Sequence, residues 1–160
     1  MGQDLGRATS TLPSHDGTEV IGTVSMTYEA RILRRRRLNT DQGASFIVDL
    51  SETTNLIDGA VFVLEGGQSI RVKSADEALI EVRGAELARL AWHVGNRHTP
   101  CQISSDRLWI QQDHVLKAML EQLGASVTDV TRPFNPEGGA YGHGRTYGHT
   151  HADDHEHSHV

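Results

Sequence analysis

Histidine is concentrated at one end of this chain. Six of the ten histidines lie in the last eighteen residues, mostly at alternate positions and with carboxylates between them. Neutral imidazole is a favoured ligand of nickel, copper, zinc and cobalt, and a flexible run can bring several rings round one ion. The pattern predicts metal ligands at His143, His149, His151, His155, His157 and His159. A solvated polar tail or a purification remnant is the alternative, and histidine density alone does not choose the metal.

Two histidines outside this tail are further candidate ligands. His98 follows a predicted helix in the turn-forming sequence "GNRHTP", which favours display of its ring at the surface. A single imidazole is a poor metal site, but a two-fold dimer would bring two copies of His98 together near its axis. His114 lies in the first turn of a second predicted helix, where a capping-region histidine without a ligand role fits equally well.

Two residues of similar chemistry are expected to pack instead. His93 stands beside Trp92 within the first predicted helix, where packing or a backbone hydrogen bond is the simpler role. Cys101 lies three residues after His98 and could form a His-x-x-Cys pair for a soft ion. A lone cysteine that enters a strand is more often a small buried hydrophobe, so we predict burial.

The sequence contains none of the motifs that would indicate an enzyme. It lacks His-Glu-x-x-His, the phosphate-binding Gly-x-x-x-x-Gly-Lys and the nucleophile motif Gly-x-Ser-x-Gly. The only cysteine excludes an intrachain disulfide framework, and no apolar leader or membrane-length segment is present. These features predict a non-enzymatic, cytoplasmic protein with no membrane association.

One basic run departs from the acidic composition of the chain. The formal net charge of -6 argues against nucleic-acid binding by the whole molecule, yet Arg34 to Arg37 are consecutive. In a strand, such side chains project from both faces and reach water, so a solvated strand is the simplest interpretation. A nucleic-acid site and an acidic protein partner remain as alternatives.

The elements that would carry these residues fall into two halves. Residues 1–20, rich in Gly, Ser, Thr and Asp, predict a disordered extension. Residues 21–76 predict a small all-β domain, because short β-branched segments alternate with turn residues. These strands are expected at 46–50, 60–65 and 69–74, with Gly66-Gly67 as a hairpin turn.

Residues 77–134 predict a ferredoxin-like α+β domain. Apolar residues recur at helical spacing over 85–96 and 113–124, with Asp113 as N-cap and Gly124 beyond the second helix. Strands are expected at 78–83, on both sides of Ser105-Asp106, and at 125–130. This order, β-α-β-β-α-β, allows two helices to cover one face of a four-stranded antiparallel sheet. Residues 135–160 predict a flexible tail.

Several stretches, taken in order, resemble a known family. The sequences "LAWHVGNRHTPCQI", "QQDHVLKAMLEQLGA" and "PFNPEGGAYGHGRTYGHTH" are similar to those of the urease accessory protein UreE family. Earlier, "RRRRLNTDQGASFIVDL" and "VFVLEGGQSIRVKSADEALIEVRG" resemble its N-terminal domain. The resemblance covers about residues 34–141, and residues 1–20 have no recognised counterpart.

The resemblance implies a nickel metallochaperone. It implies a homodimer, an N-terminal domain likened to a chaperone peptide-binding module, and Ni(II) held by His98 at the dimer interface. His114 would be a secondary metal position, while Gln112 stands where some members have another histidine. Nickel would pass to apo-urease with the urease GTPase accessory protein UreG and its complex, and Zn(II) or Cu(II) could compete in vitro. The rival function is a histidine-tail metal store without a dedicated client.

Overall fold

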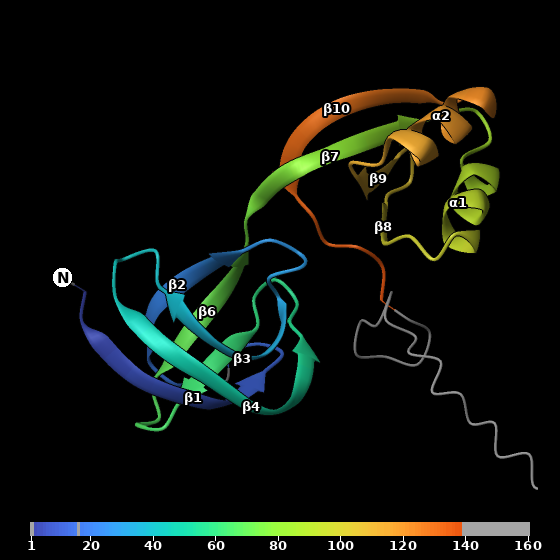
Figure 1. The fold of residues 1–160 in the computed structure, drawn as a ribbon. Helices are drawn as coiled ribbons and strands as arrows, with labels where there is room; N and C mark the ends of the chain where they lie inside the picture. The colour runs from blue at the N-terminus through green and yellow to red at the C-terminus, as the bar shows by residue number, and fades with distance from the viewer. Residues whose placement is uncertain (1, 16, 139–160) are drawn as a thin grey trace, which may run out of the picture.

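A strongly curved six-stranded sheet forms the N-terminal half of the molecule (Figure 1). The computed structural model describes residues 2–15 and 17–138. Strand order across the sheet is β2-β6-β5-β1-β4-β3, with β1–β4 and β2–β6 as parallel pairs. The strands are β1 (Asp4–Leu12), β2 (Val20–Met26), β3 (Ile32–Asn39), β4 (Ser45–Asn55), β5 (Val61–Leu64) and β6 (Ser69–Ser74).

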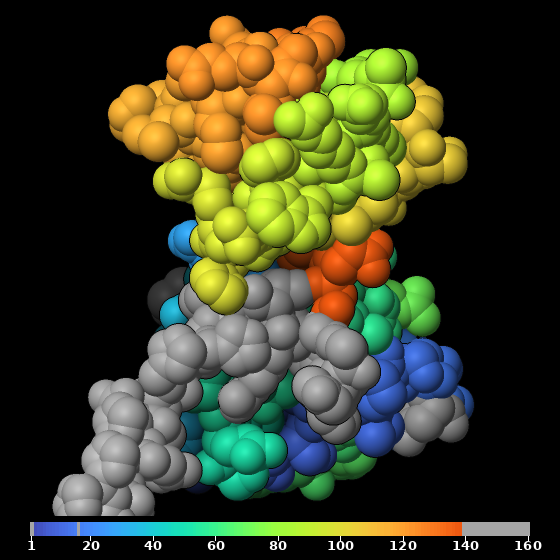
Figure 2. All heavy atoms as spheres, turned by 90° about the vertical axis from the view of Figure 1, so that its right-hand side faces the viewer, coloured from blue at the N-terminus to red at the C-terminus, as the bar shows by residue number. Residues whose placement is uncertain are grey.

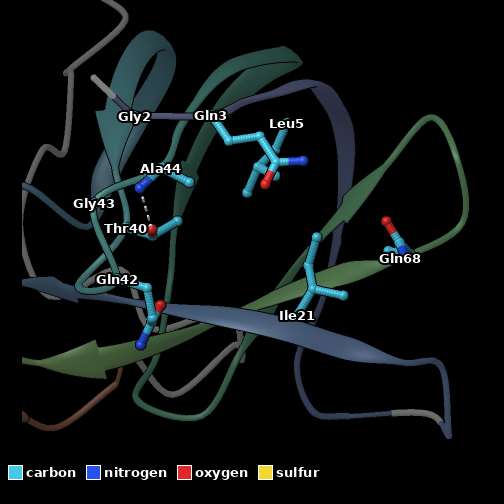
Figure 3. A pocket seen from close by; sticks show the side chains of 9 residues that line it. All are labelled: Gly2, Gln3, Leu5, Ile21, Thr40, Gln42, Gly43, Ala44 and Gln68. Atoms are coloured by element: carbon cyan, nitrogen blue, oxygen red, sulfur yellow. Dashed lines mark hydrogen bonds between the residues drawn. The ribbon is translucent and has the colours of Figure 1, made fainter.

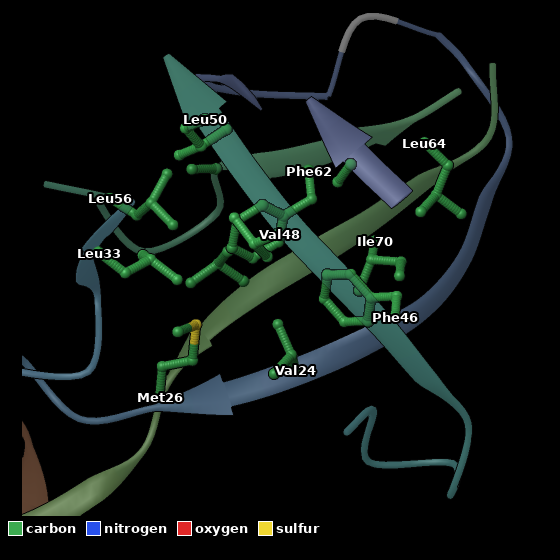
Figure 4. Close-up of a cluster of buried hydrophobic side chains, with 13 residues drawn as sticks. Val24, Met26, Leu33, Phe46, Val48, Leu50, Leu56, Phe62, Leu64 and Ile70 are labelled. Carbon is green, nitrogen blue, oxygen red and sulfur yellow. The ribbon is translucent and has the colours of Figure 1, made fainter. Parts of the chain in front are cut away.

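Alternating apolar residues of these strands fill the interior of the curved sheet. Along β4, Phe46, Val48 and Leu50 are buried, because successive side chains of a strand point to opposite faces. Figure 4 shows them gathered with side chains of the neighbouring strands. The rings of Phe46 and Phe62 meet edge to face with centroids 5.4 Å apart. The predicted all-β domain is confirmed.

The prediction of a disordered extension over residues 1–20 is wrong for its first part. Strand β1 lies inside the sheet between β4 and β5, and Ala8 on it is completely buried. Gly6 adopts a left-handed backbone (φ 89°) where the register with β4 shifts, so it marks a bulge. The polar, Gly-containing sequence of β1 gives no local strand signal. Its backbone hydrogen bonds are made with β4 and β5, which lie far away in the sequence.

The edge strand β2 is covered by the turn between β3 and β4. The Asp41 carboxylate accepts hydrogen bonds from the Thr23 hydroxyl at 2.7 Å and from the Ser25 amide at 3.3 Å. Gln42 Oε1 accepts from the Thr23 amide at 2.9 Å. The hydrogen bond from Thr23 is the main reason that the pKa of Asp41 lies below its usual range. The Asp41 amide also donates to the Thr23 carbonyl at 2.8 Å, so backbone and side-chain groups of the turn take the place of a neighbouring strand.

The C-terminal half has the predicted ferredoxin-like arrangement. Its four strands are antiparallel in the order β10-β7-β9-β8, and two helices lie on one face of this sheet (Figure 1). This order confirms the predicted fold class. The elements are β7 (Asp76–Arg83), α1 (Leu87–Asn96), β8 (Cys101–Ile103), β9 (Leu108–Gln111), α2 (His114–Gln122) and β10 (Ser126–Pro133).

Helix α2 shows why the sequence folds here as predicted. Asp113 accepts hydrogen bonds from the amides of Val115 and Leu116, which satisfies two free donors of the first turn. Leu116 and Leu120 recur at helical spacing and are buried against the sheet. In α1, Leu90 and Val94 are buried against the same sheet.

A buried arginine joins the two halves. Arg31 is 2% exposed and donates to three backbone carbonyls, those of Met26, Leu56 and Phe134. Its guanidinium lies 5.7 Å from the ring centre of Tyr28, whose own ring contacts Phe134 edge to face. Since Met26 and Leu56 belong to the first half and Phe134 follows β10, one side chain ties both halves together.

Two further predictions concern the surface. Arg34 to Arg37 on β3 are all exposed, as expected for a solvated strand. Within the described part of the chain, no helix has the length and apolar character needed to cross a membrane.

Candidate metal centre

His98 is displayed at the end of helix α1. Its amide donates to the Gly95 carbonyl at 3.0 Å, which closes a tight turn after the helix. The backbone of His98 is left-handed (φ 57°), and it is the only non-glycine residue with positive φ in the described ranges. Its side chain is exposed, as the turn signals predicted. A left-handed backbone at a residue other than glycine is one of the places where strain accompanies function.

The solvent side of α1 carries one large apolar side chain near this turn. Trp92 is 63% exposed, although indoles are usually well covered in monomeric proteins. The ring of His93 meets that of Trp92 edge to face with centroids 5.0 Å apart, so His93 packs as expected. An exposed tryptophan six residues before His98 is a feature typical of protein contact surfaces.

His114 lies on helix α2, sixteen positions after His98, which lies in the turn that follows α1. It is the first residue of α2 and is exposed. The preceding Gln112 donates its side-chain amide to the Leu79 carbonyl at 3.0 Å and to Asp129 at 3.2 Å. Gln112 therefore anchors the start of α2 to the sheet. Residues 2–15 and 17–138 contain no group of three or more potential metal ligands.

Cys101 packs as a small hydrophobe. It begins β8 and contacts the core beneath the two helices. Burial is the main reason that the pKa of its thiol rises to about 12, and the nearby Glu137 carboxylate adds to the rise. Because metals bind the thiolate, a thiol held protonated is a poor ligand. The predicted burial is therefore met only in part, because Cys101 is half-buried at the border of this core.

The segment that leads into the histidine tail is held against β8. The amide of Glu137 donates to the Cys101 carbonyl at 2.8 Å, and the amide of Asn135 donates to Gln102 Oε1 at 2.9 Å. On the other side, the Ser74 hydroxyl donates to Asn135 Oδ1 at 2.6 Å. Figure 2 shows the orange-red residues after β10 at the waist between the two halves.

The start of the tail is therefore fixed close to the turn that carries His98, because Cys101 follows His98 by three residues. Sequence patterns do not predict this contact. The predicted ligands His143, His149, His151, His155, His157 and His159 lie outside the described residues.

A separate hollow lies in the N-terminal half and contains none of the predicted ligands. It has a volume of about 620 Å³ and is bordered by the start of β1, by β2 and by the β3–β4 turn (Figure 3). Leu5 and Ile21 supply its apolar part, while Gln42 and Gln68 supply amides. Its lining carries no histidine, cysteine or carboxylate.

Comparisons with known proteins cover almost the whole chain. A family model described as "UreE urease accessory protein, N-terminal domain" matches residues 5–75, and one described as the C-terminal domain matches residues 77–159. The first model begins within β1, in the region where the sequence alone suggested no counterpart.

Individual relatives agree with the family models. The chain is 56% identical over 134 residues to the urease accessory protein UreE of Ruegeria pomeroyi, covering 84% of this chain and 90% of the relative. It is 52% identical over 154 residues to that of Rhodobacter capsulatus, covering 96% and 98%. It is 44% identical over 156 residues to that of a Chelativorans strain, again covering 96% and 98%. The chain therefore belongs to the UreE family of urease accessory proteins.

Proposed function

We propose that this protein is a cytoplasmic nickel metallochaperone for urease assembly. In this proposal it is a homodimer that holds Ni(II) through His98 of both copies and through tail histidines. It passes the ion, with the urease GTPase accessory protein UreG, to the apo-urease complex. Membership of the urease accessory family supports a role in urease maturation, while the metal, the dimer and the partners are our proposal.

The proposal is supported by the position of residues 135–138, which lead into the tail, close to His98. The Glu137 amide donates a hydrogen bond to the carbonyl of Cys101, which follows His98 by three residues. His143 follows Glu137 by six residues. Six extended residues span at most about 20 Å, so a tail imidazole can reach an ion at the His98 turn. His114 would act as a secondary position.

Two copies of His98 fit the chemistry of a cargo site. One imidazole is a weak site, whereas two from a dimer axis and further ones from the tails supply a set of borderline nitrogen ligands that suits Ni(II). Such ligands exchange more readily than a closed thiolate cage, and delivery requires exchange. The exposed Trp92 on the same helix offers apolar area for the contact between copies.

Nickel titration calorimetry with parallel sedimentation tests the proposal on four proteins. These are the full chain, a chain that ends at Tyr141, and each of them with His98→Ala. We expect the shortened chain to remain a dimer with a tight site that His98→Ala abolishes, and the full chain to bind additional ions. His15→Ala is the matched control, because it removes a histidine of the N-terminal half that is not a predicted ligand.

The opposite result supports the rival function. If all tight binding disappears with the tail and His98→Ala has no effect, the protein is a histidine-tail metal store. A monomer in sedimentation at all nickel concentrations would refute the interface site.

A further inference from the structure

An unusual concentration of arginine surrounds strand β3. The arginine patch consists of Arg7, Arg34, Arg35, Arg36 and Arg37, all of them exposed. Within the described residues, the only carboxylate in ion-pair contact with these five side chains is that of Asp49. It accepts from Arg35 at 2.8 Å and from Arg7 at 3.4 Å. Two of the five cations thus share one anion, and the other three have no ion-pair partner among the described residues, in a chain whose net charge is -6.

Two of the other arginines of the patch donate to neutral groups. Arg34 donates to the Leu50 carbonyl at 3.3 Å, and Arg37 donates to the Ser45 hydroxyl at 3.2 Å. These contacts hold the side chains along the sheet without neutralising their charge. The patch is therefore suited to bind an anionic group.

The strand geometry favours an extended acidic segment as that group. β3 is the last strand of the sheet, so its outer edge pairs with no other strand among the described residues. Arg36 lies opposite Val48 and shares its face of the sheet, whereas Arg35 and Arg37 lie opposite Asp49 and Ile47 on the other face. An extended peptide lying along the edge would meet arginines from both faces and the free backbone groups between them.

The chain itself contains such a segment. Residues 153–156 read Asp-Asp-His-Glu, with three carboxylates among four residues. Their charge is opposite to that of the patch, and their covalent attachment gives them a high effective concentration beside it.

The place where the tail leaves the described fold suits this contact. Asn135 and Gly138 line one cavity of about 330 Å³ together with Asn55 at the end of β4. Asn55 is the register partner of Ile32, the first residue of β3. Asp153 follows Gly138 by fifteen positions, which can span up to about 50 Å, whereas the five steps along the strand from Ile32 to Arg37 span roughly 17 Å. Chain length therefore does not limit the contact.

We propose that the arginine patch is a docking site for residues 153–156 of the chain's own tail in the metal-free protein. The histidines beside these carboxylates, His151, His155 and His157, connect docking with metal binding. Each bound divalent ion adds two positive charges to the segment and draws its side chains into coordination. Nickel binding is thus expected to release the tail from β3, a consequence that rests on the proposed function.

Nuclear magnetic resonance of the full chain tests the docking without disturbing the fold. The test variant Asp153→Asn/Asp154→Asn/Glu156→Gln removes three tail charges. In 20 mM NaCl, we expect the β3 amide and arginine Nε–H signals of the metal-free protein to differ between the native chain and this variant. The differences should fall by at least about half in 300 mM NaCl, because the screening length shortens.

A second variant controls for net charge. Glu86→Gln/Glu121→Gln/Asp129→Asn neutralises the same number of carboxylates in the C-terminal half, and its β3 signals should match those of the native chain. Identical β3 signals in the native chain and the tail variant at low salt would overturn the proposal. So would β3 signals that respond to an added oligonucleotide but not to the tail substitutions, since the patch would then be a nucleic-acid site.

Adding one equivalent of Ni(II) to the native chain tests release of the tail by metal separately from docking itself. We expect its β3 signals to move to those of the tail variant. If docking is observed but nickel leaves these signals unchanged, release by metal is refuted while docking stands. Calorimetry on the same sample shows whether nickel has bound, so failure of the proposed function is recognised independently.

Discussion

Replacing Arg31 should weaken the contact between the two halves more than replacing any exposed arginine would. Arg31→Met keeps an unbranched apolar side chain but removes the guanidinium that donates to Met26, Leu56 and Phe134. Three carbonyls then lose a charged donor. Burial lowers the pKa of Arg31, while the negative charges of Glu77 and Asp58 act in the opposite direction. These two carboxylates therefore stabilise the buried cation.

The expected loss follows from these three hydrogen bonds. A hydrogen bond from a charged donor contributes about 1.5–3 kcal/mol, and a carbonyl left buried without a partner adds a desolvation cost. The cavity of about 330 Å³ that Arg31 lines can admit water to some of these carbonyls, which reduces the sum. We therefore expect the free energy of unfolding to fall by roughly 3–5 kcal/mol.

Urea unfolding followed by tryptophan fluorescence measures this change. Trp109 packs in the cluster that joins the two halves, with Tyr28 and Phe134, and so reports on the joint. Arg36→Met is the matched control and should change stability by less than about 0.5 kcal/mol, because its side chain is exposed. A loss below about 1 kcal/mol for Arg31→Met, or one equal to that of the control, would refute the reasoning.

Three further predictions test other parts of the molecule. Asp113→Ala should lower the free energy of unfolding by about 0.5–2 kcal/mol, since two amides of α2 lose their acceptor; unchanged urea unfolding would contradict this. Cys101 should react with iodoacetamide at pH 8 at least about 100-fold more slowly than in unfolded chain, because its raised pKa of about 12 keeps the thiol protonated until the pH approaches that value. Equal rates would show that the thiol is not held in this way. Nickel should dissociate as the pH falls through roughly 6, because an unperturbed histidine titrates near ~6.5 and only the neutral ring binds. Full stoichiometry at pH 5 in equilibrium dialysis would indicate ligands other than histidine.

Elements with a strong local signal were predictable from sequence. The spacing of apolar residues predicts both helices of the C-terminal half, and Asp113 and Gly124 mark the ends of the second one. Gly124 has the left-handed backbone (φ 89°) that is common just after a helix. The strand order of the ferredoxin-like sheet follows from the succession of elements, because few ways of packing two helices on four antiparallel strands exist. Exposure of His98 and of Arg34 to Arg37 also follows from local patterns.

The features that depend on distant partners were not predictable in the same way. Strand β1 is polar and contains Gly6, and only the ladders with β4 and β5 make it a strand. Arg31 is unremarkable in sequence, yet it is buried because carbonyls from both halves converge on it.

Sequence patterns were enough to propose candidate metal ligands, namely His98, His114 and the histidines of the tail. That the chain leading into the tail lies near the turn of His98 became visible only in the folded molecule, where the Glu137 amide donates to the Cys101 carbonyl. The physical reason is that ligand chemistry is a property of single side chains, whereas their proximity results from hydrogen bonds between segments far apart in the chain.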